Sequence, residues 1–170
     1  MASSTGSLIT LFDTEFLTDL LTSIGNEVPE KELVLHVGAV KSWPLQLYRG
    51  RNAAMIFNTD YENEPGEHWV AVYINGQTKT AFCFDSMPLR PFPSEIRSNL
   101  CKICDRVLMV NRNGFVVQHP DYPLCGLYCL FFLEHYSKDF DFNLTPDNLL
   151  YNDIRVLAHM MPFVCKTLKK

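Results

Sequence analysis

The sequence predicts a single domain of the α+β class, with one helix buried at its centre. The 170 residues are within the usual size of one domain, so we expect residues 1–170 to fold as a unit. Hydrophobic residues make up 47% of the chain and charged residues 20%, a balance typical of globular proteins. The expected elements follow in the order helix, strands, helix, strands, helix, helix, which is typical of an α+β fold.

The first expected element is an amphipathic helix. Asp13 has the side chain of an N-cap, and Gly25 ends the helical pattern. Apolar residues recur around and between them at helical spacing: Phe12, Phe16, Leu17, Leu20, Leu21 and Ile24. Residues 26–51 contain several prolines and glycines, and we expect them to be irregular.

Three strands are expected in the middle of the chain. Residues 53–58 are apolar and indicate a buried strand, and the polar residues 60–66 then form a turn. Residues 68–74 are aromatic and β-branched and predict a second strand. Asn75-Gly76 begins a hairpin turn, so residues 80–85 should form an antiparallel partner.

The second half of the chain is expected to begin with a connecting helix at about 94–104. Residues 107–110 and 115–117 are strand-like. From Cys125 to about Ser137 the chain is apolar almost all round, which predicts a centrally buried helix.

The last expected helix begins at Thr145, with Pro146 at its first position. Its apolar residues recur at helical spacing: Leu149, Leu150, Ile154, Leu157, Ala158 and Met161.

Several function classes fit the sequence poorly. Residues 1–7 have no basic segment followed by an apolar one, so we expect an intracellular protein that is not secreted. The apolar run 127–133 is too short to cross a membrane. The six cysteines should then be reduced. Cys101 and Cys104 form one CxxC pair with no second pair at zinc spacing, so we expect no metal.

Cys125, His68 and Asp85 together suggest nucleophilic catalysis by a thiol. Cys125 begins the buried helix, and a helix N-terminus with a neighbouring imidazolium favours the thiolate. His68 begins one strand of the predicted hairpin and Asp85 ends the other, so the two lie at the same end of the hairpin. There Asp85 could orient the imidazole as a base for Cys125. Taken singly, each residue favours a simpler interpretation, His68 as a surface histidine and Asp85 as a turn residue, so the hypothesis rests on the set and its order.

Three further residues extend this hypothesis, and a fourth, Cys129, is excluded from it. Gln118, seven residues before Cys125, could direct its two amide N–H groups at the oxyanion of a tetrahedral intermediate. Gly126 leaves room for a substrate carbonyl, and Trp69 could shield the imidazole or pack in the core. Cys129 lies one helical turn further along, where burial disfavours the thiolate, so we interpret it as a core residue.

In this order, His68-Trp69, Phe84-Asp85-Ser86, Gln118 and Cys125-Gly126 resemble the adenovirus-type (adenain) cysteine peptidases. Their clan also contains the proteases of ubiquitin-like proteins, and relatives are encoded by Polinton-type transposons. The resemblance covers residues 57–133, including Phe57-Asn58-Thr59-Asp60. It implies the α+β peptidase fold of that clan, with a central mixed sheet and a buried helix that carries the nucleophile. The roles that it implies are nucleophile for Cys125, base for His68, orienting carboxylate for Asp85 and oxyanion donor for Gln118.

The resemblance also implies a substrate class. It indicates a thiol endopeptidase that cleaves viral or transposon precursor proteins after Gly, in Leu-x-Gly-Gly-like sites. Asp85 stands where adenovirus enzymes have Glu, and Asp is usual in the proteases of ubiquitin-like proteins. Two alternatives therefore remain: a peptidase of ubiquitin-like modifiers, and an inactive relative that acts as a binding protein.

Adenovirus enzymes are activated by DNA and by a viral peptide. A net charge of −4 argues against DNA activation, while a peptide activator stays open; no other cofactor is required by the sequence. We expect a monomer that acts on a protein substrate in the host nucleus or cytoplasm, or in the virion, without membrane binding.

Overall fold

The computed structural model describes most of the chain, and everything below concerns these residues. They are residues 14–26, 33–39, 48, 50–59, 68–89, 91–111, 115–138 and 144–169. Asp13, Phe12 and the turn predicted at 60–66 lie outside them. No helix of the described part is long and apolar enough to cross a membrane.

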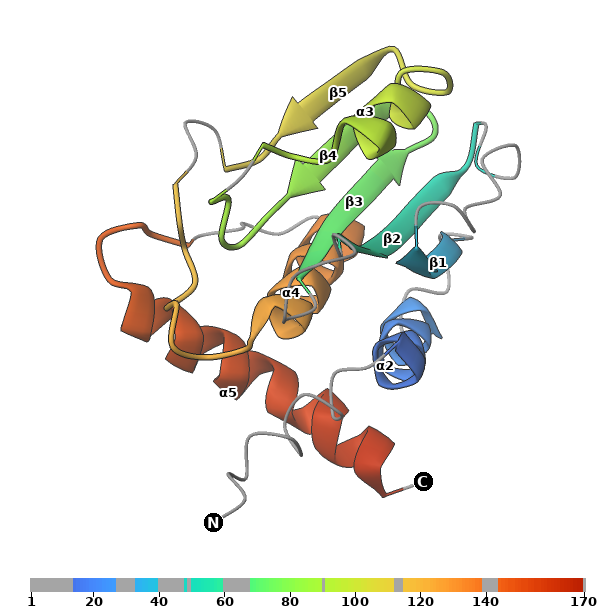
Figure 1. The fold of residues 1–170 in the computed structure, drawn as a ribbon. Coiled ribbons are helices and arrows are strands. Elements are labelled where there is room, and N and C mark those ends of the chain that lie inside the picture. The colour runs from blue at the N-terminus through green and yellow to red at the C-terminus, as the bar shows by residue number, and fades with distance from the viewer. Residues whose placement is uncertain are drawn as a thin grey trace.

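A five-stranded mixed sheet forms the centre of the molecule, and its strands lie side by side in chain order (Figure 1). The two inner pairings are antiparallel, and the two outer pairings, β1 with β2 and β4 with β5, are parallel. The strands are β1 (Leu33–Ala39), β2 (Asn52–Asn58), β3 (Trp69–Asn75), β4 (Thr80–Phe84) and β5 (Arg106–Met109).

Helices cover both faces of this sheet, as Figure 1 shows. On one face α4 packs against β3, and α2 and α5 pack against α4 and each other. The opposite face packs against α3. The helices are α2 (Thr14–Asn26), α3 (Ser94–Leu100), α4 (Cys125–Lys138) and α5 (Leu149–Leu168).

The sheet separates two hydrophobic cores because successive side chains of a strand point to opposite faces. Along β3, Trp69, Ala71 and Tyr73 join the core around α4. Val70 and Val72 join the smaller core around α3. β3 is therefore buried on both faces, which explains why its sequence is apolar throughout instead of alternating.

Most predicted elements are confirmed with small shifts of their ends. The strands at 53–58, 68–74 and 80–85 are β2, β3 and β4, and the helix predicted at 94–104 ends at Leu100 and continues as a turn. The hairpin turn is confirmed as well, because the Asn75 side chain accepts hydrogen bonds from the backbone N–H groups of residues 77 and 78.

The interpretation of residues 26–51 as irregular is wrong, because β1 lies within them. Its first five residues, LVLHV, carry the apolar and β-branched signal of a strand, but Pro29, Gly38 and Pro44 around them obscured it. Gly38 has a φ of 144°, which a residue with a side chain rarely adopts, so the glycine permits the backbone of β1 at its end.

Two further expectations fail. Residues 115–117 form no strand; instead the N–H groups of Val117 and Gln118 both donate to the carbonyl of Ser86. The last helix does not begin at Thr145, whose hydroxyl accepts from the residue 147 N–H in a turn. Its N-cap is Asn148, whose side chain accepts from the N–H three residues on.

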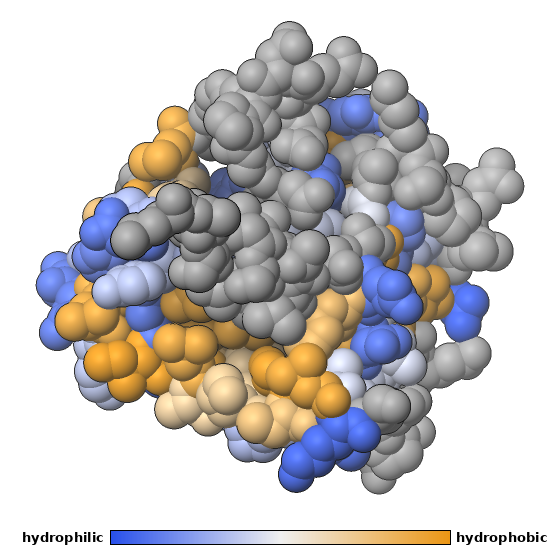
Figure 2. Space-filling model, turned by 60° about the horizontal axis from the view of Figure 1, so that its bottom comes forward, coloured by the Kyte–Doolittle hydropathy of each residue, from blue (hydrophilic) through white to orange (hydrophobic). Residues whose placement is uncertain are grey.

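Apolar side chains also remain exposed on the surface of α5. They contribute to the apolar area on the face of the molecule that Figure 2 brings forward. The large ones are Leu150, Tyr151, Ile154, Met161 and Leu168.

Candidate active site

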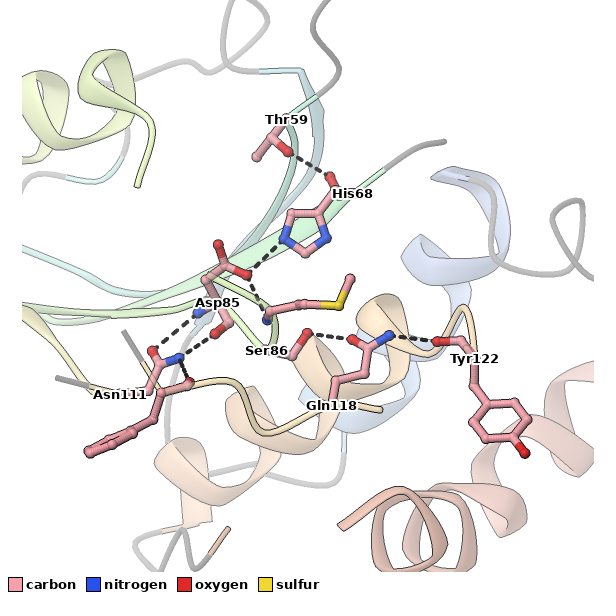
Figure 3. A network of polar contacts seen from close by, with 9 residues as sticks. Thr59, His68, Asp85, Ser86, Asn111, Gln118 and Tyr122 are labelled. Atoms are coloured by element: carbon pink, nitrogen blue, oxygen red, sulfur yellow. Dashed lines mark hydrogen bonds and ion pairs between the residues drawn. The ribbon is translucent and has the colours of Figure 1, made fainter. Parts of the chain in front are cut away.

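His68 and Asp85 meet at one end of the β3–β4 hairpin, as the sequence predicts (Figure 3). His68 immediately precedes β3, and Asp85 immediately follows β4. Because these strands are antiparallel, both residues lie at the same edge of the sheet. The Nε2 atom of His68 is 2.7 Å from Oδ1 of Asp85, so the carboxylate can accept the Nε2–H and orient the ring.

The backbone of His68 is held by Thr59, the residue that follows β2. The His68 carbonyl accepts from the Thr59 N–H at 2.9 Å and from the Thr59 hydroxyl at 3.2 Å. The imidazole therefore extends from a backbone position that is fixed by the residue after β2.

Asp85 is held even more firmly, by two residues that the sequence did not single out. Its Oδ1 also accepts from the Met87 N–H at 3.0 Å. The Asn111 side chain donates to the Asp85 carbonyl and accepts from the Asp85 N–H at 3.5 Å. Asn111 thus continues the β4–β5 pairing, with its side chain in place of backbone groups. The side chain of Asp85 is only 7% exposed.

These contacts favour the protonated form of His68. Burial alone lowers the pKa of His68, but hydrogen bonds to Asp85 and Cys125 and the charges of both groups outweigh it and raise the pKa to about 10. Since Nε2 faces Asp85, Nδ1 is the ring nitrogen left for the sulfur of Cys125. The His68 ring therefore interacts with both the carboxylate of Asp85 and the sulfur of Cys125.

Cys125 is the first residue of α4. Only 8% of this residue is exposed, so Cys125 is buried. Cys129, one turn further along, is fully buried. Burial, and then the charges of Cys125 and Asp85, raise the pKa of the Cys129 thiol well above its ordinary value, which suits the core role that the sequence predicts.

Gln118 lies beside Ser86 and Tyr122, in the segment that leads to α4 (Figure 3). Its side chain is buried, with the residue only 1% exposed. The amide oxygen accepts from the Ser86 hydroxyl at 2.6 Å, and the amide nitrogen donates to the Tyr122 carbonyl at 2.7 Å. One of the two N–H groups is thus occupied, so Gln118 has one left for an oxyanion, where the sequence suggested two.

Trp69 and Gly126 are both placed in the core. Trp69 is 2% exposed. A Cβ atom on Gly126 would lie 3.0 Å from Cδ2 of Leu17, so the missing side chain lets α4 approach α2 closely. Contact of either residue with a substrate stays a prediction.

The backbone on both sides of Gln118 is held by residues of α4 and α5 that sequence reasoning missed. Asn152 donates to the Val117 carbonyl at 2.9 Å, and Asp153 accepts from the His119 N–H at 3.2 Å. The Tyr128 hydroxyl lies 2.6 Å from Oδ1 of Asp153. Burial, and then the Asp153 carboxylate, raise the pKa of Tyr128. The sequence signal that could have indicated this contact is the polar pair Asn152-Asp153 near the start of the otherwise amphipathic last helix.

The described part of the chain offers no candidate metal centre. Among the described residues, no group of three or more His, Cys, Asp or Glu side chains could hold a metal ion. None of the six cysteines forms a disulfide; Cys101 and Cys165 are exposed, and Cys83 and Cys104 are buried.

Comparison with known proteins identifies the class to which this fold and site belong. Residues 39–163 match the model of the adenovirus endoprotease family, and the chain belongs to that family. It is 31% identical to the protease of human adenovirus D serotype 9 over 105 residues, and the match covers 55% of this chain and 50% of that protein. The chain therefore spans about half the length of the adenovirus proteases that it matches.

Solved structures confirm the fold class. The SUMO protease Ulp1, solved with its catalytic cysteine oxidised to a sulfonic acid, matches with a TM-score of 0.53 and 16% identity, over 92% of this chain and 78% of that one. ChlaDub1 from Chlamydia trachomatis matches with a TM-score of 0.52 and 16% identity, over 91% of this chain and 78% of that one. The expected α+β peptidase fold, with a mixed sheet and a buried helix that begins at Cys125, is thus confirmed.

Proposed function

We propose that this protein is a cysteine endopeptidase with Cys125 as nucleophile, His68 as base, Asp85 as orienting group and Gln118 as oxyanion donor. The observation that carries the proposal is the His68 ring, whose Nε2 lies 2.7 Å from Oδ1 of Asp85 and whose pKa is raised by hydrogen bonds to both Asp85 and Cys125. Membership of the adenovirus endoprotease family supports a peptidase, and the matched range 39–163 includes all four positions.

In the proposed reaction, the Cys125 thiolate attacks the scissile carbonyl carbon. The oxyanion that forms accepts from the free amide N–H of Gln118 and from the backbone N–H of Cys125. The His68 imidazolium donates its proton to the leaving amine, and the acyl group stays on sulfur as a thioester. Neutral His68 then accepts a proton from water, which attacks the thioester and releases the acid.

The proposed substrates are viral or transposon precursor proteins that are cut after Gly in Leu-x-Gly-Gly-like sequences. The family membership supports this substrate class. The low exposure of Cys125 supports it independently, because a residue without a side chain brings its carbonyl most easily to a recessed sulfur.

A peptidase of ubiquitin-like modifiers is the second candidate. Asp85, the residue type usual in proteases of ubiquitin-like proteins, favours it. A pair of substrates separates the two: a fluorogenic Leu-x-Gly-Gly peptide and an intact SUMO or ubiquitin conjugate. A protease of viral or transposon precursors should cleave the peptide at least as efficiently as the conjugate. A clear preference for the conjugate would reverse the order of the two candidates.

An inactive binding protein is excluded by the same assay if Cys125→Ala abolishes cleavage. Cys165→Ala is the matched control, because Cys165 is an exposed thiol on α5, far along the chain from the proposed site. The assay is run with the protein alone, then with DNA, then with candidate activating peptides. We expect no stimulation by DNA, because the chain carries a net charge of −4.

A further inference from the structure

Ser86 connects the two halves of the candidate site. It directly follows Asp85, it is 0% exposed, and three of its contacts involve the segment that carries Gln118. Its carbonyl accepts from the N–H groups of Val117 and Gln118 at 3.0 and 3.2 Å. Its hydroxyl donates to the Gln118 amide oxygen at 2.6 Å, across 32 residues of sequence (Figure 3).

The side-chain amide of Gln118 can act as an oxyanion donor only in one of its two orientations. The Tyr122 carbonyl can only accept a hydrogen bond, so the amide nitrogen must face it. The amide oxygen then faces Ser86, whose hydroxyl donates to it. With both ends held, the second N–H of the amide has a fixed direction.

We propose that Ser86 is a positioning residue for the oxyanion donor: its hydroxyl fixes the Gln118 amide so that one N–H remains directed at the oxyanion. This inference rests on the proposed peptidase function and extends it to a residue outside the four assigned above. Ser86 touches neither substrate nor sulfur in this scheme and acts through Gln118.

Two physical effects follow from the Ser86 hydrogen bond. An oxyanion donor is effective when its direction is set before the charge develops, and a buried hydrogen bond of 2.6 Å restricts rotation of the amide. A donor on the carbonyl end also polarises the amide, which strengthens its N–H groups as donors. Both effects stabilise the tetrahedral intermediate more than the bound substrate, so they affect kcat and leave KM nearly unchanged.

The test is a double-mutant cycle of Ser86→Ala and Gln118→Ala, with kcat and KM measured on a Leu-x-Gly-Gly peptide. We expect Ser86→Ala to lower kcat about three- to tenfold, the effect of one neutral hydrogen bond, with KM changed by less than about twofold. On the Gln118→Ala background the same substitution should change nothing further. Equal losses on both backgrounds, or a loss confined to KM, would overturn the proposal.

Two controls separate positioning from general damage. Thr80→Val removes another buried hydroxyl at the opposite end of β4 and should leave kcat unchanged. Alkylation of Cys125 by iodoacetamide forms no oxyanion, so its rate should be the same in the wild type and in Ser86→Ala. A parallel fall in alkylation would mean that Ser86 acts on the His68–Cys125 pair, and the proposal would be wrong.

A second measurement tests the role of Ser86 even if the proposed peptidase function fails. If the wild type cleaves no peptide, that function fails, and the role of Ser86 is decided by the ¹⁵N-labelled side-chain amide of Gln118. Faster hydrogen exchange of this amide in Ser86→Ala than in the wild type supports positioning by Ser86. Unchanged exchange overturns it.

Discussion

Replacement of Asp85 by Asn tests whether the carboxylate controls the charge of His68. The amide oxygen of Asn can still accept from Nε2–H of His68 and from the Met87 N–H, so the geometry is kept while the charge is lost. Two unit charges about 4 Å apart interact by ~4 kcal/mol at an effective dielectric constant of about 20, equivalent to about 3 pKa units.

The expected change is smaller than this upper figure because the His68 side chain is 28% exposed, and solvent weakens the interaction. We therefore expect the pKa of His68 to fall from about 10 by about 1 to 2 units in the variant. Protonated His68 donates to the leaving amine, so activity is present below this pKa and is lost as the pH rises through it.

The assay is the dependence of kcat/KM on pH, followed on the alkaline side. The wild type should lose activity near pH 10, and Asp85→Asn should lose it at least one pH unit lower. Asp121→Asn is the matched control, because Asp121 faces His119 at 3.9 Å on the exposed surface. An alkaline limit that stays unchanged in Asp85→Asn would refute the assigned role of Asp85.

Three further predictions concern individual side chains. Gln118→Ala should lower kcat by about 10²–10³ in a steady-state assay with little change in KM, and a loss below about threefold would exclude it as an oxyanion donor. Cys129→Ala should reduce the free energy of unfolding by about 1 kcal/mol in urea titration while activity persists, and an inactive but folded variant would contradict the assignment of the nucleophile. Tyr128→Phe should reduce the free energy of unfolding by about 1–3 kcal/mol, because it removes a hydrogen-bond partner of buried Asp153; an unchanged thermal midpoint would show that this contact contributes nothing.

The central strands could be predicted from the sequence because their signals are local. Residues 53–58, 68–74 and 80–85 are apolar and β-branched, and Asn75-Gly76 separates the last two. The hairpin then places His68 and Asp85 at one end of the sheet, so their contact follows from short-range pattern alone.

The residues that hold the site could not be predicted in the same way. Asn111 reaches Asp85 across 26 residues, Ser86 reaches Gln118 across 32, and Asn152 reaches Val117 across 35. Such contacts depend on how distant segments pack, which spacing along the chain does not reveal. Thr145-Pro146 failed as a helix start for a related reason, since the backbone of Thr145 is bound by the side chain of Asn152.

The most direct test of the peptidase proposal is the site at which a peptide electrophile reacts. A Leu-x-Gly-Gly vinyl sulfone is incubated with the protein, and the adduct is located by peptide mapping. Cys101 and Cys165 are exposed, whereas Cys125 is 8% exposed, so accessibility alone would direct the reagent away from Cys125. We predict an adduct on Cys125 alone, which is lost in His68→Ala; labelling of the exposed cysteines with Cys125 unmodified would contradict the account.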